Sequence, residues 1–192
     1  YNLQYESMIF NKVQDLQNWL ASAESEAEVE DIYKDAYKDV VGNHIHTIKK
    51  KIPNSRAHTD GLMECKSENG TFYGIQEVKH KKSTTDWQIK QQLIQALMYD
   101  WMLQTKGKHE EAKFYIMNSE KMFVYVFSKD IEELKAKLWE VFPTIEESPC
   151  VAYKNPKIQA IVRYASINYR KYIISDRFEL DEEIKEIYKQ VA

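Results

Sequence analysis

The strongest constraint on the fold is a turn of sequence Ser-Glu-Asn-Gly at residues 67–70, which separates two segments with the character of β-strands. The segments cover 62–66 and 71–79 and are rich in apolar and β-branched residues. An Asn-Gly pair between two such segments is a strong signal for a β-hairpin. The sequence therefore predicts a hairpin as the centre of the fold.

Helical patterns lie on both sides of this hairpin. Apolar residues recur at helical spacing in several segments, and two further strand-like segments follow the longest of them. The expected helices cover about 5–20, a segment that opens with a capping box at 25–28 and ends near 42, 86–105, 128–143, a segment from 156 and a segment from 181, and the expected strands cover 113–117 and 122–127. This order predicts an α/β protein, with a central mixed sheet of about four to five strands flanked by helices and with extra N- and C-terminal helices.

The chain has the size of one domain, at 192 residues. A loop that contains Pro149 is the one candidate boundary, and it divides a core with N-terminal helices, 1–143, from a helical extension, 144–192. We expect the extension to pack on the core. The first residue is Tyr1, which suggests a fragment of a longer protein.

Charge and cysteine content restrict the function classes. The formal charge is −3, so the chain is not coated with cations, but basic residues concentrate at 49–51 and 79–82 and can form a phosphate-binding stripe. Two cysteines give neither a disulfide framework nor a four-cysteine metal site. The apolar runs are too short for a membrane span, and the N-terminus does not resemble a signal peptide. These features predict a cytoplasmic protein without a membrane partner.

A Glu-x-Lys triplet occurs five times, so its presence alone carries no information. The triplet at 77–79 differs because it lies at the end of a strand, where alternation places Glu77 and Lys79 on one face. Asp60 precedes Gly61 at the start of the partner strand, which brings Asp60 toward Glu77. Two converging carboxylates favour a hard cation such as Mg²⁺ or Mn²⁺, and Lys79 can hold a water molecule or neutralise charge on a phosphate.

The helix that follows the hairpin carries polar residues at regular spacing. Its apolar stripe is expected to be buried and comprises Ile89, Leu93, Leu97 and Trp101. The opposite face is expected to be exposed and to offer hydrogen bonds to phosphates, bases or water; it comprises Gln88, Gln92, Gln95 and Tyr99. The alternative interpretation is that glutamine is a good helix former on a solvated surface.

Together, Asp60-Gly61, Glu77-Val78-Lys79 and the Gln95-x-x-x-Tyr99 element resemble the PD-(D/E)xK nuclease superfamily. The last element resembles its RecB-like branch, which includes nuclease domains of type I restriction enzyme motor subunits. The resemblance spans about residues 25–127 and implies a restriction-endonuclease-like core. Thr59 stands where the family motif has proline.

The resemblance also implies roles for individual residues. Asp60, Glu77 and the Val78 carbonyl would bind the metal, Lys79 would be the catalytic lysine, and Gln95 would orient water or the metal shell. The family expects one more ligand from the first core helix; Glu30 is favoured, with Glu26, His44 and His46 as alternatives. The residues expected to contact nucleic acid are Tyr99, Gln92, Gln88, Lys81 and Lys82.

The expected function is therefore that of an Mg²⁺- or Mn²⁺-dependent DNA endonuclease domain of a restriction system, with DNA and further domains or subunits as partners. One alternative is a phage-type recombination exonuclease that acts on DNA ends. Another is an inactive nuclease fold that binds DNA or protein. Sequence preference, the number of metal ions and the oligomeric state are left open by the sequence.

Overall fold

The computed structural model describes residues 13–41, 44–80, 85–120, 122–145, 148–168, 185–187 and 189–190. Five strands form one mixed sheet in the order in which they occur along the chain: β1 (Ile45–Ile48), β2 (Gly61–Ser67), β3 (Gly70–Val78), β4 (Phe114–Asn118) and β5 (Phe123–Phe127). The helices are α2 (Val13–Ser22), α3 (Glu26–Val41), α4 (Asp86–Gly107), α5 (Glu132–Ile145) and α6 (Pro156–Arg163), with 3₁₀ turns η2 (Ser128–Ile131) and η3 (Ala152–Lys154). The predicted α/β class, with a four- to five-stranded mixed sheet flanked by helices, is confirmed.

The sheet combines antiparallel and parallel pairs. Strands β1, β2 and β3 are antiparallel neighbours, and β4 and β5 form a second antiparallel pair. Strand β3 pairs with β4 in parallel, and α4 makes the crossover between them, as parallel neighbours require. Strand β1 was not predicted, because its four residues, which alternate between buried and exposed, are too few to give a clear pattern.

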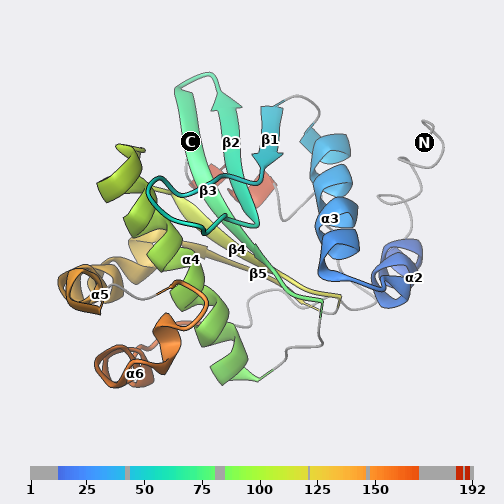
Figure 1. Cartoon of the computed structure of the whole chain (residues 1–192). Helices are drawn as coiled ribbons and strands as arrows, with labels where there is room; N and C mark the ends of the chain where they lie inside the picture. Colours follow the sequence, from blue (N-terminus) through green and yellow to red (C-terminus); the bar gives the residue numbers. More distant parts are fainter. Residues whose placement is uncertain are drawn as a thin grey trace.

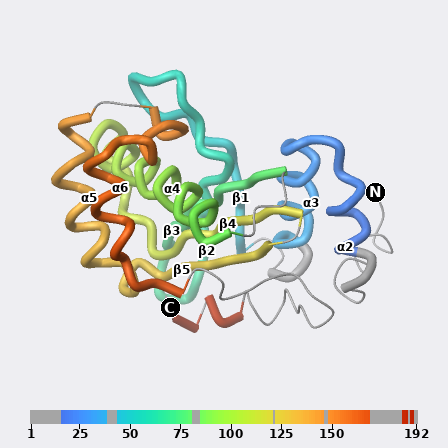
Figure 2. Tube along the Cα trace, turned by 90° about the horizontal axis from the view of Figure 1, so that it is seen from below, coloured from blue at the N-terminus to red at the C-terminus, as the bar shows by residue number. Residues whose placement is uncertain are grey.

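Helices cover both faces of the sheet (Figure 1). On one face α4, α5 and α6 enclose a core that includes Leu93, Leu138 and Ile158. On the other face α2 and α3 pack against the sheet through residues such as Leu20 and Val29. The view from below shows the same division, with α2 and α3 on one side and α4, α5 and α6 on the other (Figure 2).

Helix α4 corrects one expectation about exposure. Gln92, Gln95 and Tyr99 were expected on an exposed face, but their exposed fractions are only 2%, 7% and 5%. The reason is that α4 lies between the sheet on one side and α5 and η3 on the other, so most of its circumference is covered. A helical pattern with one apolar stripe does not reveal a second layer of helices that covers the polar stripe.

Helix α3 is held on the sheet by two buried tyrosines. The Tyr33 hydroxyl donates to the Ser119 carbonyl oxygen at 2.9 Å, and the Tyr37 hydroxyl donates to Asn118 Oδ1 at 2.9 Å. Both acceptors lie where β4 ends and turns toward β5. These long-range bonds fix the position of α3 relative to the centre of the sheet.

The region after α5 packs on the core as far as it is described. Asn155 caps α6 by accepting a hydrogen bond from the Lys157 backbone N–H, and Ile158 and Val162 are buried in the core. A final helix was predicted from about 181; residues 185–187 and 189–190 are helical, and the rest of 169–192 lies outside the described residues. Within the described part of the chain, no helix is both long and apolar enough to span a lipid bilayer.

Candidate metal centre

The β2–β3 hairpin brings Asp60 and Glu77 together, as the sequence predicts. Gly61 pairs with Gln76, so Asp60 and Glu77 lie at the next position of the ladder. The Val78 backbone N–H donates to Asp60 Oδ2 at 2.8 Å, which fixes the orientation of that carboxylate. The Val78 carbonyl, implied as a metal ligand by the family resemblance, keeps that role as a prediction only.

Gly61 has a steric reason to follow Asp60. A Cβ atom at this position would lie 2.6 Å from Gln76 Oε1 and 2.7 Å from Thr47 Cγ2. Such distances are shorter than van der Waals contact, so a larger residue would push the start of β2 away from its neighbours. Glycine therefore allows Asp60 to sit close to β3.

Lys79 lies at the end of β3 and connects three elements. Its Nζ is 3.0 Å from Glu77 Oε1, 3.1 Å from Gln95 Oε1 on α4, and 3.9 Å from Glu26 Oε1 on α3. Burial lowers the pKa of Lys79, but the charge of Glu77 and the hydrogen bond to it outweigh that effect and raise the pKa. Lys79 is therefore a fixed positive charge inside an acidic cluster.

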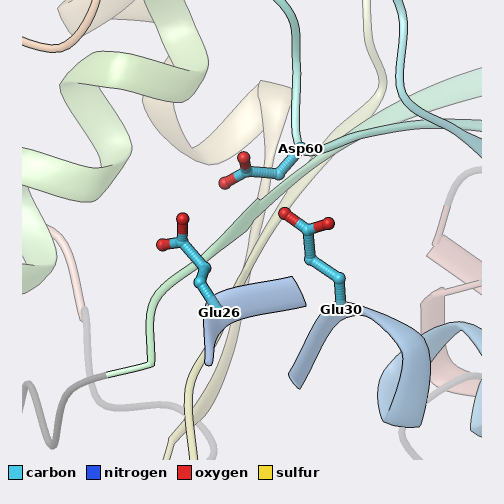
Figure 3. Close-up of side chains that lie close together, drawn as sticks. All are labelled: Glu26, Glu30 and Asp60. Atoms are coloured by element: carbon cyan, nitrogen blue, oxygen red, sulfur yellow. The ribbon is translucent and has the colours of Figure 1, made fainter. Parts of the chain in front are cut away.

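Helix α3 adds two carboxylates to the cluster. Glu26 and Glu30 lie one turn apart on the helix, and both side chains point toward Asp60 (Figure 3). One carboxylate oxygen from each of the three residues lies within 4.8 Å of the others. Glu30 was the favoured ligand from this helix, and Glu26 was an alternative; the structure brings both together. Among the described residues, neither His44 nor His46 belongs to such a group.

The three glutamates of this cluster resist ionisation. Glu77 is 1% exposed, and burial and the nearby Asp60 charge raise its pKa well above the usual value. Burial and the charge of Asp60 raise the pKa of Glu30 to about 7, and the same causes raise that of Glu26. Glu77 Oε2 is buried and has no hydrogen-bond partner among the described residues. A cation would favour the ionised form of all of these groups.

His80 connects the end of β3 to the α2–α3 turn. Its Nε2 donates to the Ala23 carbonyl oxygen at 2.7 Å, three residues before Glu26. This bond positions the first turn of α3 beside Lys79, a role that the basic run 79–82 does not reveal. Lys81 and Lys82, predicted to contact nucleic acid, lie outside the described residues.

The polar stripe of α4 has several different environments. Gln95 bonds to Lys79 and, through Nε2, to the Cys150 carbonyl oxygen at 3.5 Å. Gln88 is exposed and forms a capping box with Thr85 at the start of the helix. Gln92 is buried, and neither of its amide atoms has a partner among the described residues. Tyr99 is buried, and burial, then the charges of Glu77, Cys150 and Asp60, raise the pKa of its phenol.

The pairing of Glu26 with Glu30 has a signal in the sequence. Positions 26, 30, 33 and 37 form one stripe of α3, acidic at its beginning and tyrosine-containing at its end. Because Tyr33 and Tyr37 face the sheet, the two glutamates must face the same side of α3. The shared stripe of Glu26, Glu30, Tyr33 and Tyr37 is visible only when the four positions are compared, and not from either glutamate alone.

Comparison with protein-family models, with curated proteins and with solved structures finds no match for this chain. The conclusions about its chemistry therefore rest on the residues themselves. Four carboxylates and one lysine converge at one end of the sheet, an arrangement suited to binding a hard divalent cation.

Proposed function

We propose that this chain is a metal-dependent nuclease domain that hydrolyses phosphodiester bonds in DNA. The observation that carries the proposal is Glu77 Oε2, a buried carboxylate oxygen without a donor, inside a cluster of acidic groups. Most buried polar atoms in native proteins have a hydrogen-bond partner, and this unpartnered oxygen lies beside Asp60, where a cation would satisfy it. An oxygen that the described residues do not satisfy is available to a cation.

The donor set fits Mg²⁺ or Mn²⁺. Asp60, Glu26 and Glu30 offer carboxylate oxygens within 4.8 Å of one another, Glu77 offers another beside Asp60, and by the family resemblance the Val78 carbonyl is a further ligand. A bound divalent ion would polarise a phosphate and lower the pKa of a bound water. The raised pKa values of Glu77 and Glu30 fit this assignment, because a cation takes the place of the protons that the carboxyls otherwise hold.

The chain's own residues supply orientation and charge. Lys79 places an ammonium beside the carboxylates, where it neutralises negative charge that develops on a phosphate during attack by water. Gln95 accepts a hydrogen bond from Lys79 and fixes the direction of the ammonium. Asp60 is fixed by the Val78 N–H and stays aimed at the cluster. The setting that the resemblance favours is a cytoplasmic restriction enzyme with further domains or subunits.

Plasmid cleavage in Mn²⁺ tests the proposal. We expect Lys79→Ala and Glu77→Gln each to lower the cleavage rate by roughly 100- to 1,000-fold, since the first removes positive charge beside the reacting phosphate and the second removes a ligand of the cation. The matched controls are Lys66→Ala and Glu64→Gln, which change a second Glu-x-Lys triplet on β2, away from the cluster. Equal rates for wild type and Lys79→Ala would contradict the role of Lys79.

Metal binding is tested separately by calorimetric titration with Mn²⁺. Asp60→Asn and Glu77→Gln are expected to abolish measurable binding, whereas Glu64→Gln keeps the wild-type titration. Binding without cleavage of any DNA would favour a metal-binding module that is not a nuclease. Unchanged titration in both site variants would overturn the metal centre itself.

A further inference from the structure

A groove with a volume of about 1000 Å³ opens beside the candidate metal centre. Three segments form its walls: the loop 54–58 that leads to β2, the C-terminal half of α4, and the residues around Pro149. Its volume is at the upper end of the roughly 300–1,000 Å³ that is typical of small-molecule pockets. The groove is therefore large enough for the base and sugar of a nucleotide.

The groove adjoins the carboxylate cluster through the hydrogen bonds that connect Lys79, Gln95 and Cys150. Tyr99 lines the groove and lies one helical turn after Gln95 on α4. His58, two residues before Asp60, lines the opposite wall. Cys150 also lines the groove, and its carbonyl accepts a hydrogen bond from Gln95, the residue that fixes Lys79. A strand whose phosphate lies at the cluster can therefore extend into the groove.

The lining combines cations with aromatic and apolar surface. Arg56 and Lys106 are exposed and lie on different walls, and the described lining residues include no Asp or Glu. Tyr99 and Trp101 contribute aromatic rings, and Met102 adds apolar surface between them. Positive charge with aromatic side chains is the combination by which proteins bind single-stranded nucleic acid, through phosphate contacts and base stacking.

We propose that this groove binds unpaired bases of a single DNA strand whose backbone passes the carboxylate cluster, which rests on the proposed nuclease function. In a duplex the bases are stacked and paired inside the helix, so they do not reach a pocket without being flipped out. An aromatic-lined groove beside the cluster selects a strand that is already unpaired. Arg56 and Lys106 hold its phosphates, and Trp101 stacks on a base.

Fluorescence anisotropy on the full chain tests the groove. The probes are labelled oligothymidylate and the same oligonucleotide annealed to its complement, both in Ca²⁺ with no Mg²⁺ or Mn²⁺. We expect tighter binding of the single strand than of the duplex. Lys106→Glu should weaken single-strand binding by about tenfold or more, because it reverses a charge beside the phosphates. Lys66→Glu, an equivalent charge reversal at the exposed position of β2, should leave single-strand binding unchanged.

A second variant addresses stacking. Trp101→Leu should weaken single-strand binding by roughly 10- to 100-fold, the range expected for loss of a base-stacking contact. Trp101 also packs on Phe142, with ring centroids 5.6 Å apart. The thermal unfolding of the Trp101→Leu variant is therefore measured in parallel. If Trp101→Leu does not fold, the exposed Lys106 and Arg56 still decide the outcome through Lys106→Glu and Arg56→Glu.

The outcomes separate this inference from the proposed function. Equal affinity for single strand and duplex, or unchanged binding in both charge-reversal variants, would contradict single-strand binding by the groove. Cleavage of plasmid in the same preparation would still support the nuclease function. If single-strand binding depends on the groove residues but no DNA is cleaved in Mn²⁺, the result supports the groove as a binding site and contradicts the nuclease function. A preference for the single strand that is lost in Lys106→Glu, together with cleavage lost in Lys79→Ala, supports both.

Discussion

Two buried carboxylates, Asp100 and Glu77, differ in how completely their oxygens are hydrogen-bonded. Asp100 on α4 is 1% exposed, and both of its oxygens have partners. Oδ1 accepts from Gln104 Nε2 at 2.9 Å and from the Ala112 N–H at 3.3 Å, and Oδ2 accepts from the Tyr115 hydroxyl and lies 3.6 Å from Lys135 Nζ. Glu77 is equally buried but has one oxygen without a partner.

The difference shows how to separate the two kinds of buried charge. The network of Asp100 joins α4, β4 and α5, and it is complete within the described residues. The network of Glu77 is incomplete, and its neighbours are further acids, Asp60 above all. A complete network stabilises the fold, whereas an incomplete one lowers stability until something binds.

Removal of Asp100 should have the largest effect on stability. Asp100→Ala leaves Lys135 without its buried counter-charge on α4, and loss of one partner of a buried ion pair costs about 3–5 kcal/mol. We expect thermal unfolding about 10 °C below that of the wild type, at roughly 2–4 °C per kcal/mol for a chain of this size. Asp130→Ala, at an exposed position, serves as control. A similar fall in its melting temperature would contradict the structural role of the Asp100 network.

Glu77→Gln should show the opposite behaviour. Its metal-free stability should stay within about 1 kcal/mol of the wild type, because burial and the Asp60 charge disfavour the ionised carboxylate that the amide replaces. Mn²⁺ at about one hundred times its dissociation constant should stabilise the wild type by about 2.7 kcal/mol, or roughly 5–10 °C. Thermal melts with and without Mn²⁺ should show this increase in wild type and Glu64→Gln, and none in Glu77→Gln.

The carboxylate cluster should also make the stability of the fold depend on pH, through Glu30. The pKa of Glu30 is raised to about 7 in the fold, so the protonated form is favoured by folding. Its contribution is therefore greatest below about 4.5 and is lost as the pH rises through about 7. In EDTA, Glu30→Gln should raise the melting temperature by a few degrees at pH 8 and by less at pH 5. A benefit that is larger at pH 5 would contradict the raised pKa.

Gln92 provides the smallest test. Both of its buried amide atoms lack partners among the described residues, so Gln92→Met should stabilise the fold by about 1 kcal/mol. Gln104→Met is the matched control on the same helix, and it should destabilise because Gln104 donates to Asp100. Chemical denaturation of both variants measures the difference. A loss of stability in Gln92→Met would show that its amide has partners in solution.

The sequence was sufficient for most of the architecture. The turn at 67–70 predicted the hairpin, and α4 and the β4–β5 pair lie within a few residues of their expected bounds. Strong local signals explain this success, since Asn-Gly and helical spacing act over neighbouring residues. Strand β1 was missed because four residues gain their strand structure from pairing with β2 rather than from their own pattern.

The site was predictable only in part. Proximity of Asp60, Glu77 and Lys79 follows from one hairpin, so strand alternation predicts it. Proximity of Glu26 depends on the angle at which α3 packs on the sheet, set by Tyr33, Tyr37 and His80. Burial of Gln92 depends on α5 and η3, which are distant in sequence. Local patterns do not encode such long-range contacts, and this limits what the sequence alone reveals.

The tyrosine bonds of α3 also determine when the acidic cluster forms during synthesis and folding. Asp60 and Glu77 belong to one hairpin, whose closure involves a short loop. Tyr33 and Tyr37 reach partners 86 and 81 residues away, where β4 ends. Because distant contacts carry the larger entropic cost of loop closure, they form later than local ones. A nascent chain that ends before Asn118 would contain the hairpin carboxylates and the His80–Ala23 bond but lack the tyrosine bonds that fix α3 on the sheet.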